Sequence, residues 1–401
     1  MTNVSSSNGL EKHPKLRFPG FDEPYKQCRI GDIYAERSQR GASDMELLSV
    51  TMNDGVMPRS EIEGKDNSSE DKSNYKVVLT GDMVYNSMRM WQGANGISPC
   101  DGIVSPAYTV LMPKIPISNG YFAAFFKSPN LINEFRKNSQ GMTSDTWNLK
   151  YPQIETIKVC IPALSEQNRV ADMLRTLERR IAKQAQLVDN LKKYKRGVVR
   201  TLLSPDSCCI EETTWTTAKI GDLGSFTKGA PLSKADITPD GTPFILYGEL
   251  YTTYHEVINS VIRRTKAQPE KQYYSHVGDV IIPTSGETPE EISTAACVML
   301  PDIILAGDLN IFRSSKIDGR IMSYILNHIV NGQIARIAQG KSVVHIQASE
   351  ISKIEISYPD YNTQCKMISV FETVGARIKS AENELTYLRT MQKALLQQLF
   401  I

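Results

Sequence analysis

Two short segments of this sequence resemble part of a catalytic or nucleotide-binding motif, but neither motif is complete. Gln339-Gly340-Lys341-Ser342 ends like a phosphate-binding loop, G-x-x-x-x-G-K-[ST], but the earlier glycine of that pattern is absent. Ser285-Gly286-Glu287-Thr288 offers a serine that could act as a nucleophile, yet no histidine or other base stands at a recognisable spacing from it. We therefore expect no nucleotide site at 339–342, and a turn at 285–288 that follows a strand ending at Pro283.

Metal and redox chemistry find equally little support. The seven cysteines are scattered, odd in number and without any C-x-x-C spacing, so they predict reduced, structural residues and no zinc site. They are Cys28, Cys100, Cys160, Cys208, Cys209, Cys297 and Cys365.

Composition predicts a globular protein and excludes little else. A chain of 401 residues with 41% hydrophobic content can form two or more domains with separate cores. No apolar run approaches the roughly 20 residues that a membrane-spanning helix needs, and the first ten residues are polar, so we expect a cytoplasmic protein. The formal charge of +2 is lower than is usual for a protein held to nucleic acid by its overall field.

The elements that position these residues occur twice. Fourteen positions between residues 154 and 203 carry residues similar to those found 197 positions later, between 351 and 400. Gly81-Asp82 and Gly278-Asp279 share that offset, while Ile30-Gly31-Asp32 and Ile220-Gly221-Asp222 differ from it by a few residues. Short insertions in loops explain this drift, and two homologous halves are therefore expected.

Each half ends in the pattern of a long helix. Apolar residues recur at alternating steps of three and four from Leu174 to Leu202 and from Met367 to Leu399, which is typical of a coiled-coil seam. Flanking prolines and polar residues predict helices at about 165–203 and 362–400. At about 1.5 Å per residue, each would be on the order of 60 Å long. Each stripe could pack on its own domain, but two matched stripes of this length favour a pair of helices that pack against each other.

Before each helix lies a segment of mixed character. Strand-like runs at 75–79 and 279–283, helix-like runs at 121–135 and 320–337, and turns rich in Gly and Pro predict a compact α/β (α+β) domain in each half. We therefore divide the chain into a disordered tail (1–13), a first domain (14–163), a central helix (164–204), a linker (205–213), a second domain (214–360) and a C-terminal helix (361–401).

Several of these segments together resemble a known family. Pro14-Lys15-Leu16-Arg17-Phe18-Pro19-Gly20-Phe21, followed by Ile30-Gly31-Asp32, closely resembles the start of type I restriction-modification specificity subunits. Glu166-Gln167 at the start of the central helix, with Lys195-Arg196-Gly197 and Leu202-Leu203 near its end, is similar to the same family. The second copy departs slightly, with Thr363-Gln364 where Glu-Gln is usual. The resemblance covers nearly the whole chain.

The resemblance implies a circular, pseudo-two-fold arrangement in which two antiparallel helices hold a target-recognition domain at each end. Each domain would read one half of a split target in double-stranded DNA, and half-sites read from one face lie about 34–36 Å, or a multiple of that, apart. It also implies a chain without catalysis or cofactor of its own. Two modification (methyltransferase) subunits and, for cleavage, restriction subunits would supply the chemistry with S-adenosylmethionine, ATP and Mg. No Pro-Pro dipeptide, part of the base-binding motif of an adenine methyltransferase, occurs here.

Candidate DNA contacts lie in two pairs of loops, because base edges and phosphates are bound by polar and basic side chains that reach into a groove. The basic run at 192–196 could track phosphates across the unread spacer, or be a solvated helix face. The candidates are Asn86, Arg89, Gln92, Gln140, Thr143, Asp145 and Trp147 in the first half and Thr284, Ser285, Gln339, Lys341, Ser342, His345 and Gln347 in the second.

Two other classes of function stay open. A coiled-coil scaffold that joins proteins without touching DNA would also explain the near-neutral charge. An enzyme with an unrecognised site, for instance a nuclease, would cleave or methylate DNA as an isolated chain when metal or S-adenosylmethionine is supplied, and we expect no such activity.

Overall fold

The computed structural model describes residues 2–3, 14–41, 44–52, 55–64, 66, 68–143, 146–338 and 344–400. The chain divides into two units: unit 1 comprises Met1–Gln186 with Asn383–Ile401, and unit 2 comprises Leu187–Glu382. Among the helices built from the described residues, none is both long enough and apolar enough to cross a lipid bilayer.

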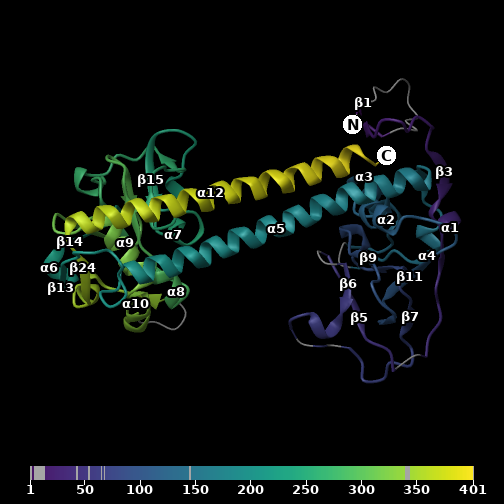
Figure 1. The fold of residues 1–401 in the computed structure, drawn as a ribbon, viewed down its shortest axis with the longest axis horizontal. Helices are drawn as coiled ribbons and strands as arrows, with labels where there is room; N and C mark the ends of the chain where they lie inside the picture. Colours follow the sequence, from purple (N-terminus) through teal and green to yellow (C-terminus); the bar gives the residue numbers. More distant parts are fainter. Residues whose placement is uncertain are drawn as a thin grey trace. The chain divides into compact units, whose positions relative to one another are not determined.

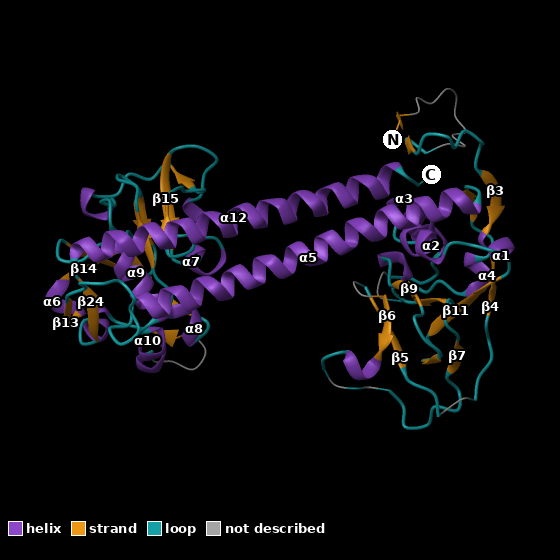
Figure 2. Ribbon diagram, viewed as in Figure 1, coloured by secondary structure: helices purple, strands orange, loops and turns teal. Residues whose placement is uncertain are grey.

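Unit 1 is built around a four-stranded antiparallel sheet with the strand order β4-β11-β8-β9 (Figures 1 and 2). The same unit has short two-stranded sheets, formed by β1 with β2, β3 with β12, β5 with β6, and β7 with β10. The strands are β1 (Thr2–Asn3), β2 (Leu16–Arg17), β3 (Lys26–Arg29), β4 (Tyr34–Glu36), β5 (Leu48–Thr51), β6 (Gly55–Pro58), β7 (Lys76–Val78), β8 (Met83–Asn86), β9 (Asn95–Ile97), β10 (Gly102–Val104), β11 (Tyr108–Pro113) and β12 (Lys158–Ile161).

Helices of unit 1 cover this sheet with aromatic side chains. Tyr121, Phe122 and Phe125 of α2 are buried together with Phe135 of α3 and form the centre of the core. The single helical run predicted at 121–135 is interrupted, because Pro129 disfavours helical geometry at Ser128, which instead caps α3. The helical segments are α1 (Ile30–Ile33), η1 (Arg59–Glu61), η2 (Met90–Gln92), α2 (Asn119–Phe125), α3 (Pro129–Asn138) and α4 (Tyr151–Ile154).

Unit 2 has a five-stranded sheet of order β14-β22-β18-β20-β16, antiparallel except between β20 and β16. A second sheet, β17-β15-β21, and the pairs β13-β24 and β19-β23 complete it. The strands are β13 (Trp215–Lys219), β14 (Gly224–Lys228), β15 (Thr242–Leu246), β16 (Val257–Ile258), β17 (Arg264–Thr265), β18 (Asp279–Pro283), β19 (Ser285–Gly286), β20 (Ala296–Val298), β21 (Ile304–Ala306), β22 (Leu309–Ser314), β23 (Val344–His345) and β24 (Glu355–Pro359).

Short helices pack on these strands. The segment predicted as helical at 320–337 forms α9 and α10, with a break at Ile329 and Val330. The helical segments are α6 (Ile220–Leu223), η3 (Lys234–Asp236), α7 (Glu249–Thr252), η4 (Lys271–Tyr273), α8 (Pro289–Ile292), α9 (Gly319–His328), α10 (Asn331–Ile337) and α11 (Ala348–Ile351).

The two long predicted helices are α5 (Leu164–Leu202) and α12 (Tyr361–Gln398). Every residue on their predicted seams is buried or half-buried. In unit 1, Leu174 near the start of α5 shares a core with Leu399 just after α12. In unit 2, Leu202 at the end of α5 shares a core with Met367 near the start of α12. Each unit also has an ion pair between the helices, Arg180–Glu384 (2.8 Å) in unit 1 and Lys192–Glu382 (2.7 Å) in unit 2.

The same hydrogen bonds hold the long helix to its domain in both units. The buried Gln167 accepts a bond from the backbone N–H of Ser118 (3.0 Å) and donates one to the carbonyl of Pro162 (3.0 Å). Gln364, 197 positions later, makes the equivalent bonds at 2.9 and 2.8 Å. A side-chain amide that satisfies one donor and one acceptor is specific to its position, so this match supports two copies of one scaffold.

A glycine turn before the central strand is also duplicated. Gly81 and Gly278 have φ of +92° and +93°, a conformation that glycine adopts without steric cost. The following residues, Asp82 and Asp279, each accept a hydrogen bond of 2.8 Å from the backbone N–H three positions earlier. The offset of 197 residues found in the sequence is therefore an equivalence of local structure.

Candidate DNA interface

The first candidate loop of unit 1 leaves the central strand β8 at Asn86. The side-chain oxygen of Asn86 accepts a hydrogen bond from the N–H of Met88 (3.0 Å), which turns the chain away from the sheet. Arg89 is exposed after this turn, and Gln92 is half-buried in η2. The turn thus presents Arg89 to solvent, while strand β8, which precedes the turn, stays in the core.

The second candidate loop of unit 1 is closed by a pair of backbone hydrogen bonds between Gln140 and Asn148 (3.0 and 2.8 Å). Gln140 and Thr143 are exposed, and Trp147 is half-buried. Met142 is almost fully exposed, at 99%. Asp145, also a candidate, lies outside the described residues.

Direct contacts bring these two loops together. The N–H of Leu149 donates to the carbonyl of Ser87 (2.8 Å), and the rings of Trp91 and Trp147 meet edge to face at 5.2 Å. The guanidinium of Arg136, from α3, lies 5.5 Å from the centre of the Trp147 ring. The result is one surface that combines hydrogen-bond donors with flat apolar groups, the two kinds of group that contact base edges and thymine methyls.

Trp91, Met142 and Arg136 belong to this surface although sequence reasoning did not single them out. The run of tryptophan and arginine in these loops was the available signal, but the pairing of the loops is a tertiary contact that no spacing in the sequence encodes.

In unit 2 the structure separates the predicted residues into buried and exposed ones. Ser285 is buried, and its hydroxyl donates to a carboxylate oxygen of Asp308 (2.7 Å) while its carbonyl accepts from the hydroxyl of Tyr251 (2.6 Å). Its polar atoms are therefore engaged inside the unit. Thr284 is half-buried, and its carbonyl accepts from the N–H of Ile346 (3.0 Å).

The segment after Pro283 continues into a strand, β19, where a turn was predicted. Ser285 pairs with His345 across the two-stranded sheet β19-β23, and His345 and Gln347 are exposed. The short sheet thereby joins the two predicted loops of unit 2, as the Trp pair does in unit 1. Three other candidates, Gln339, Lys341 and Ser342, lie outside the described residues.

Lys228, on β14, is a basic residue near this site that the sequence did not indicate. Its ammonium group lies 2.8 Å from the side-chain oxygen of Asn310. Burial lowers the pKa of Lys228, against the opposing attraction of Asp308. This lysine therefore has a cost of desolvation that an anion bound nearby would reduce.

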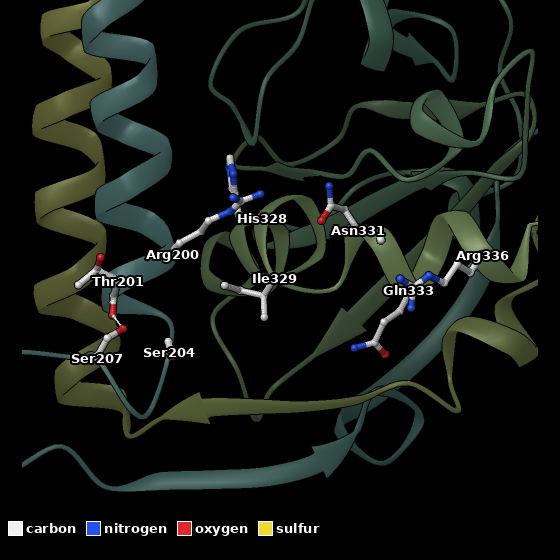
Figure 3. A pocket seen from close by; sticks show the side chains of 10 residues that line it. Arg200, Thr201, Ser204, Ser207, His328, Ile329, Asn331, Gln333 and Arg336 are labelled. Atoms are coloured by element: carbon white, nitrogen blue, oxygen red, sulfur yellow. Dashed lines mark hydrogen bonds between the residues drawn. The ribbon is translucent and has the colours of Figure 1, made fainter.

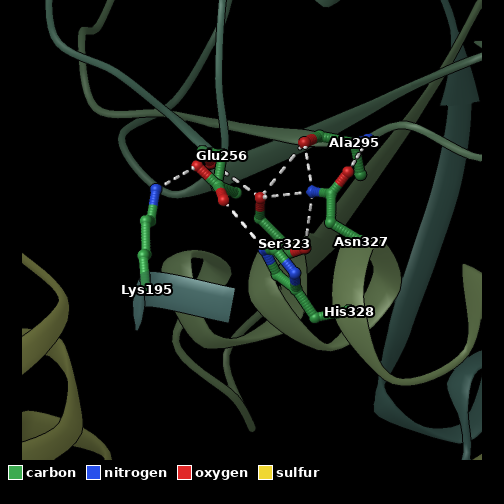
Figure 4. Close-up of polar contacts among 6 residues, drawn as sticks. All are labelled: Lys195, Glu256, Ala295, Ser323, Asn327 and His328. Carbon is green, nitrogen blue, oxygen red and sulfur yellow. Dashed lines mark hydrogen bonds and ion pairs between the residues drawn. The ribbon is translucent and has the colours of Figure 1, made fainter. Parts of the chain in front are cut away.

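The basic run at 192–196 is partly neutralised. Lys192 pairs with Glu382, and Lys195 pairs with Glu256 at 2.7 Å (Figure 4). His328 contacts the other oxygen of Glu256 at 2.8 Å. Burial alone would raise the pKa of Glu256, but the contact with His328 and the ammonium of Lys195 outweigh it and lower the pKa to about 2. Lys195 thus fastens α5 to unit 2.

No group of three or more His, Cys, Asp or Glu side chains in the described ranges is arranged to hold a metal ion.

Comparison with known proteins finds one matching family model and several solved structures of similar fold. Residues 212–389 match the family model of the type I restriction modification DNA specificity domain. The crystal structure of the HsdS subunit from Thermoanaerobacter tengcongensis is similar over 98% of this chain and 99% of that one, with 14% identity and a TM-score of 0.51. The S subunit of a type I restriction-modification system from M. genitalium is similar over 97% and 99%, with 14% identity and a TM-score of 0.58.

A third similar chain comes from a structural study of complex assembly and conformational transition of a type I R-M system. It shares 13% identity and a TM-score of 0.62 over 96% of this chain and 99% of that one. At such identities the likeness to the three structures establishes the fold, and the family match concerns residues 212–389.

Proposed function

We propose that this chain, whose residues 212–389 match the type I restriction modification DNA specificity domain, is a specificity subunit of that family and recognises a two-part target in double-stranded DNA. Each unit would read one half of the target, unit 1 with the surface around Arg89, Gln140 and Trp147, and unit 2 with the loops joined by β19 and β23.

The duplicated scaffold with different loops is the observation that carries this proposal. Gln167 and Gln364 make the same hydrogen bonds, so the two domains are fastened to their helices in the same way. The exposed loops differ, since unit 1 joins them by a Trp pair and unit 2 by a short sheet. One scaffold with two sets of polar side chains is suited to two half-sites of different sequence.

We further propose that α5 and α12 form an antiparallel coiled coil that separates the two readers in a circular, pseudo-two-fold arrangement. Contacts inside unit 1 join the start of α5 to the end of α12, and contacts inside unit 2 join the end of α5 to the start of α12. Opposite directions of the two helices explain both sets. A helical spacer would fix the distance between half-sites.

In this proposal the chain recognises DNA and has no catalytic role. Its partners would be two modification subunits, which bind S-adenosylmethionine, and restriction subunits, which use ATP and Mg. The hydroxyl of Ser285, the serine considered as a nucleophile, donates to a carboxylate of Asp308 and contacts no imidazole among the described residues. This supports a structural role for that serine.

DNA binding can be tested with the full chain in complex with its modification subunits. In mobility-shift measurements we expect the complex to retain a small set of genomic fragments, and the methylated adenines of cells carrying the system to define one split motif. A scaffold without DNA binding would retain no fragment. Cleavage or methylation of DNA by the isolated chain would instead assign it an activity of its own.

A further inference from the structure

Unit 2 contains an open hollow of about 620 Å³ between the end of α5 and the helices α9 and α10 (Figure 3). Its lining includes Arg200 and Ser204 from the α5 side, His328 at the end of α9, and Gln333 and Arg336 from α10. Arg200, Gln333 and Arg336 are all exposed. A ligand could reach all three from solvent.

The charge of this hollow is positive. Neither Arg200 nor Arg336 forms an ion pair or side-chain hydrogen bond with any residue that the structure describes. No aspartate or glutamate is among the lining residues. The carboxylate nearest to His328 is that of Glu256, which Lys195 already neutralises. Two guanidinium groups with hydroxyl and amide donors around them favour an anion, and a phosphate ester above all.

The hollow lies beside the candidate DNA loops of unit 2. Helix α10, which carries Arg336, ends at Ile337, two residues before the candidate Gln339. Helix α10 also packs against α8, which in turn contacts β19 and β23, where Ser285 and His345 pair. A duplex read by these loops would therefore bring its sugar-phosphate backbone close to Arg336.

We propose that this hollow binds phosphates of the DNA backbone next to the half-site read by unit 2. This inference rests on the proposed function. It assigns Arg200 and Arg336 to affinity and register, and leaves sequence preference to the loops, because phosphate contacts position a protein on DNA without reading its sequence.

The corresponding helix of unit 1 offers its arginine to a different group. Arg136 of α3 has the place that Arg336 has on α10 in the order of elements, but its guanidinium lies over the ring of Trp147. The backbone contact is therefore a property of unit 2, and the two half-sites should differ in their dependence on salt.

The test compares the salt dependence of DNA binding by the full chain with its modification subunits, wild type against Arg200→Ala, Arg336→Ala and the double variant. The slope of log K against log salt changes by about 0.9 for each phosphate that the protein no longer neutralises. We expect each single variant to neutralise about one phosphate fewer and to bind about tenfold more weakly near 0.1 M salt. Target and non-target duplexes should be weakened by the same factor.

Three further variants act as controls. Arg336→Lys retains the charge, so the salt slope should be close to that of the wild type. Gln333→Glu adds a negative charge to the hollow and should weaken binding to both duplexes. Arg377→Ala removes an exposed arginine of α12 in unit 2 outside the lining, and should leave the slope unchanged.

An unchanged slope in the double variant would overturn the assignment of the hollow. A weakening limited to the target duplex would also overturn it, since that points to base reading. If ATP suppresses DNA binding by the wild type but not by the Arg336→Ala variant, the hollow would instead be a site for free nucleotide. If the wild-type complex binds no duplex at low salt, the proposed function itself fails.

Discussion

The long helices of the two units share a buried glutamine near their start, Gln167 and Gln364, but the residue that precedes it differs. In unit 1, Glu166 precedes Gln167 and is 1% exposed; it forms a two-pronged ion pair with the guanidinium of Arg17 at 2.8 and 2.7 Å. The hydroxyl of Tyr25 adds a bond of 3.3 Å. In unit 2 the same position is Thr363, whose hydroxyl donates to a carboxylate oxygen of Asp360 (2.9 Å).

This difference indicates how each unit fastens the segment that leads into its domain. In unit 2 that segment follows directly on α5, and Leu203 beside it is already buried in the core. In unit 1 the leading segment is held by side chains, since Arg17 binds Glu166 and Phe18 lies under the guanidinium of Arg169 at 5.5 Å. The motif around Arg17 and Phe18 therefore attaches the leading segment of unit 1 to α5. In unit 2 the leading segment is already joined to the end of α5 by the chain itself, which explains why Thr363 can stand where unit 1 has Glu166.

The largest expected effect breaks this fastening. Arg17→Ala leaves the carboxylate of Glu166 buried without its cationic partner, which should lower the free energy of unfolding of unit 1 by about 3–5 kcal/mol. Thr363→Ala in unit 2 removes one hydrogen bond and should cost about 1 kcal/mol. Urea unfolding monitored by amide hydrogen exchange measures the stability of each unit separately. Replacing both charges, Arg17→Met with Glu166→Leu, should recover most of the stability; equal costs for the two single variants would contradict the comparison.

The second prediction concerns an ion pair present in unit 2. Glu256→Gln should destabilise unit 2 by about 3 kcal/mol, because the native pKa of about 2 lies well below the usual 4.5. The stabilisation by Glu256 is complete above about pH 4.5 and is lost as the pH falls toward 2. Thermal unfolding of wild type and variant from about pH 2 to about pH 6 checks this: the two curves should converge at the acid end, and a constant gap would argue against it.

A matched pair of variants sharpens the claim that the scaffold is duplicated. Gln167→Ala and Gln364→Ala each leave a backbone donor and a backbone carbonyl without their side-chain partner, so each should cost about 2 kcal/mol. Similar losses of protection in the corresponding unit are expected by hydrogen exchange. A loss confined to one unit would mean that the two amides differ in role despite their equal geometry.

The smallest effect concerns the duplicated turn. Gly81→Ala and Gly278→Ala force alanine into positive φ and should each cost about 1 kcal/mol. Gly278 has open space around a new methyl group, whereas at Gly81 the methyl would lie 3.1 Å from the side-chain nitrogen of Asn119. The Gly81 variant should therefore be slightly less stable. Chemical denaturation of both variants is sufficient, and two neutral substitutions would remove the turn from the shared scaffold.

The sequence predicted the features that repeat or have a period. The helices at α5 and α12 end within a few residues of the expected positions, because an apolar stripe of such length fits few other structures. The strand at 279–283 was also placed correctly. All five of its residues are buried, so the protein interior continues past the strand to Ser285, which the sequence had assigned to a turn.

Loop contacts could not be predicted in the same way. Nothing in the spacing of Trp91 and Trp147 indicates that their rings meet, and nothing distinguishes Arg136, which lies on a ring, from Arg336, which lines a hollow. Such contacts depend on how the loops are brought together by the strands beneath them.

The central claim is that each unit reads its own half of one DNA target. It is tested most directly by mapping methylated adenines across the genome in cells that carry the wild-type chain, Trp147→Ala or His345→Ala, together with the modification subunits. We predict one split motif for the wild type, relaxed in one half by Trp147→Ala and in the other half by His345→Ala. A continuous motif, or both variants altering the same half, would contradict this account.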